Sequence, residues 1–228
     1  CLQPDTRPNT YFSKEGICPA CNYHSMLKNI NWKQRYKILE EICEKSRGDG
    51  KKFDCIIGVS GGKDSLRQSL FIRDKLKMKP LLVSLTHPPQ TVTEIGVENL
   101  SNLINHGFDI IVSGPSPITW KRLMREGFLK YCNYRKSTEY ALYTSVPQIA
   151  IRFNIPLIFW GENPGLQLGD MKTTKKRGWD GNNLRNMNTL GGGDAKWIKK
   201  IRPKIINSWV FISIGGCSGI LFSCFLKL

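Results

Sequence analysis

The chain has 228 residues, of which 40% are hydrophobic, so it is long enough for one domain with a sizeable core plus appendages. Its 34 Lys and Arg stand against 18 Asp and Glu, which gives a formal net charge of +16. This apolar content and mixed charge pattern indicate a globular protein and exclude a chain that is unable to bury a core.

The positive charge is concentrated. Residues 171–204 carry ten Lys or Arg and two Asp, so this stretch supplies half of the net charge. A basic segment of this kind can bind nucleic acid, a phosphorylated sugar or a membrane surface. It can equally be a solvated loop, and the composition does not decide among these interpretations.

Eight cysteines lie at positions 1, 18, 21, 43, 55, 132, 217 and 224. No secretory signal peptide opens the chain, because residues 1–8 are polar and include two prolines. We therefore expect a cytoplasmic protein with reduced thiols, whose cysteines bind metal or are buried. Cys43 and Cys55 fall on apolar faces and are expected in the core, and Cys132 is expected to be structural.

Residues 1–30 are expected to form a small, irregular, Cys-rich module. Cys18 and Cys21 have the C-x-x-C spacing that chelates Zn²⁺, and with Cys1 they supply three of the four ligands of a structural zinc site. The fourth ligand is either His24 or a cysteine ahead of residue 1. A buried or redox-active cysteine pair is the alternative.

Helical and strand patterns alternate along residues 31–163, which predicts an α/β domain with a doubly wound parallel sheet. Helices are expected at 31–45, 65–77, 92–106, 117–131 and 137–153, and strands at 53–59, 80–85, 108–113 and 156–160. Ligands of such sheets bind at the carboxyl ends of the strands. We therefore expect residues 60–65, 86–87, 113–114 and 161–163 to lie along one edge.

Residues 60–65 read Ser-Gly-Gly-Lys-Asp-Ser, between an apolar strand and a helix. Two glycines allow positive φ and a close approach of the backbone to a ligand. The following helix start points N–H groups at an anion, so this loop suits a pyrophosphate. The spacing is not that of a Walker A loop. A chance Gly-Gly turn is the alternative.

The last two segments break the alternation. Residues 164–204 form a basic loop region rich in Gly and Asn, with three glycines at 191–193. Residues 205–226 contain no charged residue, so the tail 205–228 is either a membrane span with a Gly215/Gly219 pair or an aberrant terminus. We favour the aberrant terminus.

Several segments together resemble the N-acetyl sugar amidotransferases, which belong to the PP-loop ATP pyrophosphatases and have an adenine-nucleotide alpha hydrolase-like fold. The segments are residues 1–9, 16–21, 60–65, 93–96 and 160–164. The resemblance runs from residue 1 to about 204. Members of this family are longer than this chain, so it resembles a C-terminally shortened member.

The resemblance implies an enzyme that converts an acetamido group of a nucleotide-linked sugar into an acetamidino group, in bacterial surface-polysaccharide or flagellin-glycan synthesis. ATP, with Mg²⁺, activates the amide oxygen as an adenylate, and ammonia from a separate glutaminase displaces AMP. The implied ATP-binding residues are Val59, Ser60, Gly61, Gly62, Lys63, Asp64, Ser65 and Gly161. Lys63, Asp64 and Glu162 are the implied catalytic residues.

Two other functions stay open. PP-loop tRNA thiolases share the loop and zinc-binding cysteines, and the net charge suits tRNA. They usually carry paired cysteines after the loop, however, whereas only Cys132 follows it within the expected sheet domain, which makes nucleic acid the less favoured partner. The second alternative is a non-catalytic nucleotide-binding module tethered to a membrane, which requires the apolar tail to be genuine.

Overall fold

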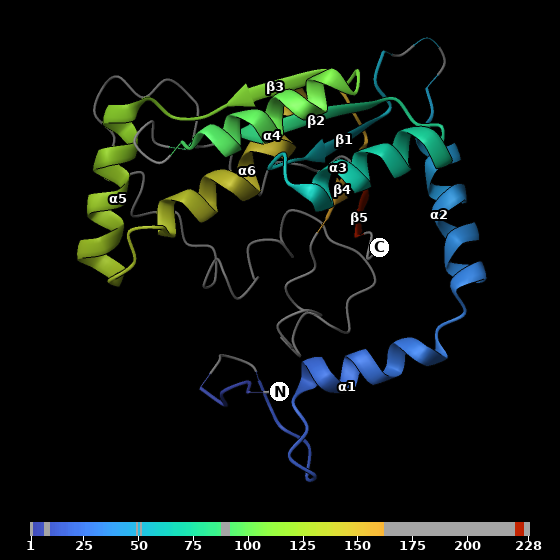
Figure 1. The fold of residues 1–228 in the computed structure, drawn as a ribbon, viewed down its shortest axis with the longest axis horizontal. Coiled ribbons are helices and arrows are strands. Elements are labelled where there is room, and N and C mark those ends of the chain that lie inside the picture. The colour runs from blue at the N-terminus through green and yellow to red at the C-terminus, as the bar shows by residue number, and fades with distance from the viewer. Residues whose placement is uncertain are drawn as a thin grey trace.

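A computed structural model of the chain describes residues 2–6, 10–48, 50, 52–87 and 92–161, and the backbone of 222–225 (Figure 1). The described part is a parallel β-sheet with helices packed on it, so the α/β class expected from the alternation is confirmed. The basic region 164–204 and most of the apolar tail lie outside these residues.

The sheet has the strand order β3-β2-β1-β4-β5, and all its neighbouring strands are parallel. Its strands are β1 (Cys55–Gly58), β2 (Pro80–Leu85), β3 (Ile110–Ser113), β4 (Leu157–Trp160) and β5 (Phe222–Phe225). From β1 the chain builds outward to β2 and β3 and then returns to the other side of β1 for β4. The order therefore reverses between β1 and β4, which is the position where doubly wound sheets bind ligands.

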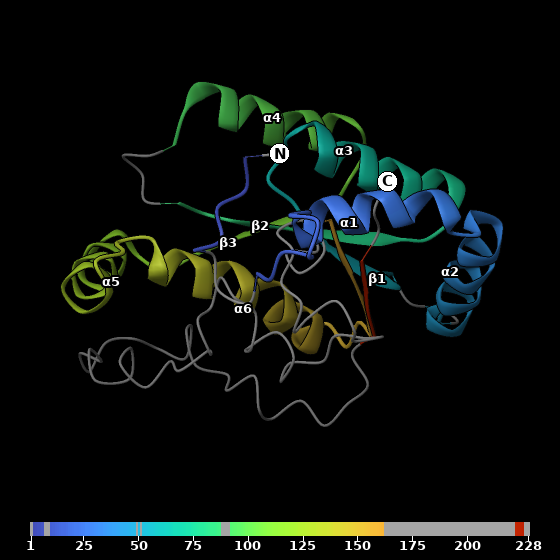
Figure 2. The same cartoon turned by 90° about the horizontal axis from the view of Figure 1, so that it is seen from below.

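Helices cover both faces of the sheet, which is compatible with the expected doubly wound fold. Figure 2 shows α3 (Lys63–Leu70) and α4 (Glu94–Asn105) on one side of the strands, and α6 (Lys136–Arg152) with α5 (Pro117–Tyr131) on the other. α2 (Trp32–Ser46) lies at one end, and its Leu39 and Cys43 join the core on the α3 side.

Alternate strand residues enter two separate cores because successive side chains of a strand point to opposite faces. On the α3 side, Ile57, Leu82 and Phe159 are completely buried. On the α6 side, Ile56 and Ile158 pack with residues of α6. Burial on both faces explains why these strands read as continuous apolar runs. Cys43 and Cys55 are buried in the first core, as expected from the sequence.

Two local features differ from the expectation. The helix after the glycine loop begins at Lys63 and continues as a π-helical turn, η2 (Phe71–Lys75), in which the N–H of Leu76 bonds to the carbonyl of Phe71. The N-terminal segment is not wholly irregular, since α1 (Pro19–Met26) and the 3₁₀ turn η1 (Leu27–Asn29) form there. Pro19 at the first helical position favours this start, because its fixed φ already suits a helix.

The end of the chain contributes one strand to the sheet. The backbone of β5 pairs in parallel with β4, from Leu157 beside Phe222 to Trp160 beside Phe225. These four residues belong to the apolar tail, and the rest of residues 205–228 lies outside the described part. Among the described residues, none of the helices combines the length and apolarity that crossing a bilayer requires.

The core makes a direct prediction about stability. Phe159→Ala removes a completely buried ring from β4 and is expected to lower the free energy of unfolding by about 3–5 kcal/mol. Phe153→Ala is the matched control, because that ring is 50% exposed and its loss should change stability by less than about 0.5 kcal/mol. Urea unfolding followed by circular dichroism measures both, and equal losses would contradict the described core.

Candidate functional site

The glycine loop (residues 60–65) leaves the sheet at the point where the strand order reverses. β1 ends at Gly58, and the N–H of Val59 continues the ladder by donating to the carbonyl of Val83 at 2.9 Å. The loop then turns into α3, whose first residue is Lys63. Because β1 pairs with both β2 and β4, the loop opens between the carboxyl ends of its two neighbours.

Gly61 is the residue that the loop conformation requires. Its φ is +84°, a value that side-chain-bearing residues rarely adopt. A Cβ there would come within 2.8 Å of the Asn99 carbonyl carbon and 2.9 Å of the Leu100 nitrogen, both in the backbone of α4. Gly61 therefore allows the loop to pack directly against α4.

Gly62, unlike Gly61, has an ordinary backbone conformation. Its φ of −67° and ψ of 172° are open to any residue, and a Cβ would meet only the Ser60 hydroxyl, at 3.6 Å. The fold therefore does not require glycine at this position. Glycine instead leaves the backbone at the start of α3 without a side chain over it.

Two serine hydroxyls hold the loop closed. The Gly62 N–H donates to Ser60 Oγ at 3.4 Å, and Ser65 Oγ donates to the Gly62 carbonyl at 3.1 Å. The two hydroxyl oxygens lie 3.3 Å apart. Both serines expected to bind phosphate are therefore brought together on one side of the loop.

The start of α3 is open toward solvent. Gly62 is its N-cap residue and supplies no side-chain cap, and the first α-helical bond of the loop region runs from the Leu66 N–H to the Gly62 carbonyl. The N–H groups of the first turn have no acceptor within the helix itself, so they and the helix dipole favour an anion. Lys63 and Asp64 are exposed beside this end.

Gly161 brings the end of β4 against α3. A Cβ on Gly161 would lie 2.9 Å from Oε1 of Gln68, so this amide side chain occupies the space beside the glycine. Gln68 is 4% exposed, and its Nε2 has no hydrogen-bond partner among the described residues. Gln68 was not among the residues expected from the sequence. Its position one helical turn after Asp64 is the signal that places it near the loop.

Trp160, which precedes Gly161, packs into the core on the α6 side. Its ring lies 5.7 Å from that of Tyr143 in α6, and its indole N–H has no partner among the described residues. Glu162, expected as a catalytic residue, lies outside the described part, as do Asn163 and Pro164. The structure thus places Gly161 near α3 and leaves the Glu162 prediction untested.

The ends of β2 and β3 are joined closely at the same edge. The N–H of Thr86 donates to the carbonyl of Ser113 at 2.9 Å, and the Thr86 side chain fills the space where a Cβ of Gly114 would lie. The parallel register carries these residues to the same side of the sheet as the glycine loop. His87 is exposed there.

Cys18 and Cys21 lie at the start of α1. Cys18 is buried and caps the helix, since its Sγ accepts a hydrogen bond from the Cys21 N–H at 3.4 Å. This bond lowers the pKa of the Cys18 thiol, which favours the thiolate form that binds metal. Among the described residues, no three potential ligands lie together as a metal site requires, and Cys1 lies outside them. The zinc prediction therefore rests on the C-x-x-C spacing of Cys18 and Cys21.

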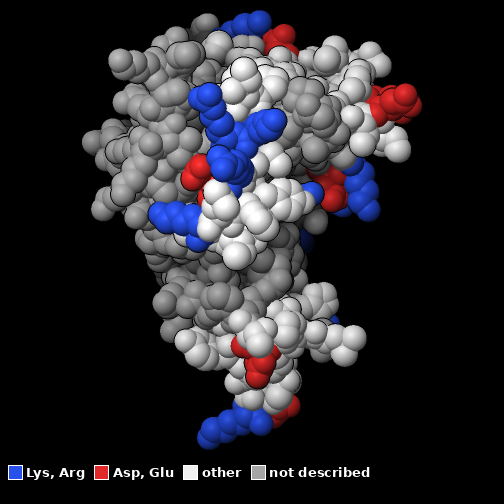
Figure 3. All heavy atoms as spheres, turned by 90° about the vertical axis from the view of Figure 1, so that its left-hand side faces the viewer, with Lys and Arg blue, Asp and Glu red and all other residues white. Residues whose placement is uncertain are grey.

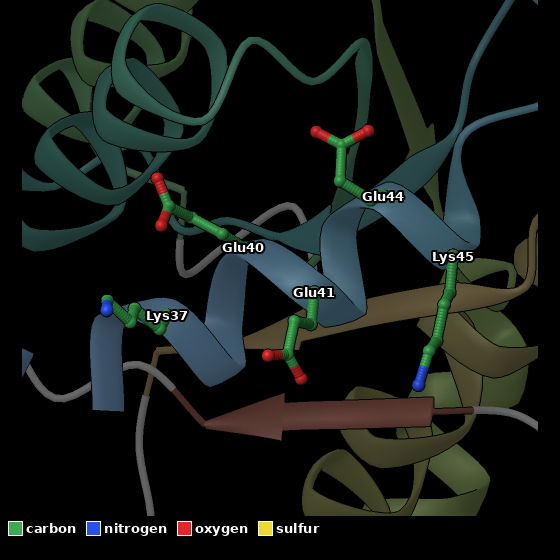
Figure 4. A pocket seen from close by; sticks show the side chains of 5 residues that line it. All are labelled: Lys37, Glu40, Glu41, Glu44 and Lys45. Carbon is green, nitrogen blue, oxygen red and sulfur yellow. The ribbon is translucent and has the colours of Figure 1, made fainter. Parts of the chain in front are cut away.

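A shallow hollow of about 450 Å³ lies along α2, away from the glycine loop (Figure 4). Its lining comes from a single helix and comprises Lys37, Glu40, Glu41, Glu44 and Lys45. Glu40 and Glu44 point to one side of the helix and Glu41 and Lys45 to the other. Three carboxylates repel a polyphosphate, so this hollow is not a candidate for the nucleotide.

Comparison with known proteins adds little to the site. No family model matches the chain. Over 91 residues it is 33% identical to an uncharacterized protein of Methanocaldococcus jannaschii, a match that covers 40% of this chain. The matched part spans 31% of the length of that protein, whose description assigns no activity.

Proposed function

We propose that the glycine loop binds the pyrophosphate part of ATP and that the protein is an N-acetyl sugar amidotransferase of the PP-loop type. The observation that carries the proposal is the position of the loop. A Ser-Gly-Gly-Lys-Asp-Ser sequence opens a helix at the strand-order reversal of a parallel sheet. Such a reversal and helix start are where α/β proteins bind phosphorylated ligands.

The loop residues would contribute to ATP binding in different ways. The N–H groups at the start of α3 and the hydroxyls of Ser60 and Ser65 would donate to phosphate oxygens, and Lys63 would add a positive charge. Asp64 offers a carboxylate for the Mg²⁺ that accompanies ATP, and that ion supplies charge neutralisation on the phosphates. Gln68 Nε2 provides a buried donor beside Gly161 with no described partner.

In the proposed reaction, the amide oxygen of the sugar attacks the α-phosphorus of ATP, and the bond to the β-phosphate oxygen breaks. The leaving pyrophosphate gains negative charge, which the loop N–H groups and Lys63 stabilise. Ammonia then adds to the activated carbon, and AMP departs with the former amide oxygen. Glu162, outside the described residues, is proposed to hold Mg²⁺ or to orient the substrate.

The proposal includes further components. Ammonia would come from a separate glutaminase, and a nucleotide-linked N-acetyl sugar would be the acceptor. The reaction consumes ATP, and the proposed zinc ligands are reduced cysteines, so the cytoplasm is the proposed compartment. A zinc ion bound by Cys1, Cys18, Cys21 and one further ligand would stabilise the N-terminal module.

tRNA thiolation remains the second candidate because of the net charge of +16.

Two glycine substitutions test ATP binding. Gly62→Ala places a methyl group where the phosphate must approach, so it should weaken ATP binding by at least about tenfold while stability changes by less than about 0.5 kcal/mol. Gly61→Ala should lower both ATP affinity and stability, because it strains the positive φ and its methyl group meets α4. The expected loss of stability is about 1–3 kcal/mol. Isothermal titration with ATP-Mg²⁺ and urea unfolding separate the two effects.

Ser65→Ala serves as the graded control, because it removes one hydroxyl donor and its bond to the Gly62 carbonyl but adds no atom where the phosphate approaches. It should weaken ATP binding less than Gly62→Ala does. If the Gly62→Ala protein binds ATP as the parent does, then the loop does not hold the phosphates and the proposed function fails.

The cysteine pair predicts a measurable metal content. Protein purified without chelators is expected to carry up to about one zinc per chain, and Cys18→Ser with Cys21→Ser should remove it, since both replaced thiolates are proposed ligands. Elemental analysis by mass spectrometry measures the zinc. Cys132→Ser is the control, because this exposed cysteine belongs to the end of α5 and should leave the zinc content unchanged. Equal zinc in all three proteins would remove the site from the proposal.

The acceptor distinguishes the two candidate functions. The protein is incubated with ATP-Mg²⁺, ammonium and a UDP-linked diacetamido sugar, or with ATP-Mg²⁺, sulfide and bulk tRNA, and AMP and pyrophosphate are measured. The sugar is expected to stimulate AMP release, and a high ammonium concentration replaces the glutaminase. Exchange of an amide oxygen for a nitrogen lowers the product mass by about one unit, which mass spectrometry detects. Stimulation by tRNA alone would contradict the amidotransferase proposal.

A further inference from the structure

α5 carries a second stripe of residues that the fold does not use. Its inner side is formed by Trp120, Leu123 and Gly127, which are buried against the rest of the protein. The opposite side carries a stripe at helical spacing, which we call the outer stripe. It consists of Ile118, Lys121, Arg122, Arg125 and Leu129. All five are exposed, and Ile118 and Leu129 expose 67% and 63% of their surface.

The outer stripe carries three positive charges, and none of them is held in a described ion pair. α5 carries four Lys or Arg and one acidic residue, Glu126, which is half-buried. None of the ion pairs in the described part of the chain includes Lys121, Arg122 or Arg125. Figure 3, which looks onto the α5 end of the molecule, shows Lys and Arg side chains gathered on this face, with acidic side chains beside them.

Aromatic rings lie at the end of the stripe, where α5 turns into α6. Phe128 and Tyr134 are 56% and 49% exposed. Lys130 lies over the ring of Tyr131 at 5.2 Å, and Arg135 lies over Tyr134 at 5.7 Å. Exposed tyrosines beside Lys and Arg are typical of surfaces that contact the headgroup layer of a membrane.

We propose that the outer stripe of α5 binds the surface of an anionic lipid bilayer, with Ile118, Phe128 and Leu129 inserted at the headgroup boundary. Ile118 and Leu129 are separated by about three helical turns, or about 16 Å, on the same side of the helix. Both side chains can reach the same membrane surface only if the axis of α5 lies parallel to that surface. Lys121, Arg122 and Arg125 lie between them and would meet the lipid phosphates.

A lipid surface fits these residues better than a nucleic acid does. Single-stranded nucleic acids bind through stacking on aromatic rings and through phosphate contacts, and the rings at the end of the stripe together with its basic residues offer both. Exposed Ile118 and Leu129 add nothing to such binding, whereas the headgroup boundary of a bilayer accommodates large apolar side chains beside Lys and Arg. These two aliphatic side chains are the observation that favours a lipid surface.

The experiment is cosedimentation of the full-length protein with vesicles of phosphatidylcholine alone or mixed with phosphatidylglycerol, without nucleotide. We expect binding to the mixed vesicles, weaker at high salt, and little to the neutral ones. Lys121→Gln with Arg122→Gln and Arg125→Gln should weaken binding about a hundredfold, at roughly fivefold per charge. Ile118→Ser with Leu129→Ser should also weaken it, by at least about tenfold.

Matched control variants test whether the loss of any three positive charges, or of any two exposed apolar side chains, weakens vesicle binding. Lys75→Gln, Lys77→Gln and Lys79→Gln change the net charge equally at exposed sites at the end of η2 and in the segment before β2, and should leave vesicle binding unchanged. Val97→Ser with Ile104→Ser makes the matching apolar change on α4, where both side chains are more than half exposed. Circular dichroism shows whether each variant is folded.

Three results would overturn the proposal. Vesicle binding that survives both α5 variants would assign membrane contact to another segment, such as the apolar tail. Absence of binding to anionic vesicles would remove the lipid surface altogether. Tight binding of a fluorescent single-stranded RNA that depends on the three charges but not on Ile118 and Leu129, and that competes with vesicles, would assign the stripe to nucleic acid. None of these outcomes depends on ATP binding.

Discussion

The parallel pairing of β1 with both β2 and β4 is the constraint on which the candidate site depends. β1 has hydrogen-bonded neighbours on each side and packed side chains on each face, and these contacts fix its position in the sheet. Its carboxyl end is therefore a fixed point, and the chain must leave the sheet there. The neighbouring connections depart toward opposite sides, since β2 follows a helix on one face and β4 follows helices on the other. The glycine loop occupies the space that this divergence leaves.

The conformation of the loop is supported from both sides of that space. On one side Gly61 contacts the backbone of α4, and on the other Gly161 contacts Gln68 of α3. The contact of Gly61 is with backbone and excludes a Cβ, so the position of the loop depends on this glycine, whereas Gly161 meets the end of the Gln68 side chain. Rigid positioning of this kind lets N–H groups and hydroxyls face a ligand without reorganisation, which is how preorganised sites stabilise developing charge. The buried Gln68 amide lies beside Gly161 at this position.

The sequence predicted the order and approximate bounds of the helices and strands from residue 31 to 160, because each strand is a continuous apolar run and each helix has an apolar face. It also identified the glycine loop, whose residue types carry their own conformational signal. It did not predict Gln68, because a buried amide leaves no periodic pattern and its position depends on where β4 returns to the sheet. Helix α1 was missed because only Pro19 and the Cys18 cap favour it, and a short helix of low amphipathicity resembles a turn. Glu162 and the basic region 164–204 lie outside the described residues, so those predictions stand as they were made.

The exposed stripe on α5 follows from the path of the chain. The connection from β3 to β4 must cross β2 and β1, a lateral distance of about 14 Å at the usual strand spacing. α6 alone, with 17 residues, is long enough for this crossing at about 25 Å, and it packs on β1, β2 and β4. α5 is thus not needed to close the sheet, and it packs chiefly against α6. A helix that covers no strand buries only one narrow side, formed here around Trp120 and Leu123. Its other side contributes nothing to the described core, so Ile118 and Leu129, with three basic residues between them, are left exposed to an external surface.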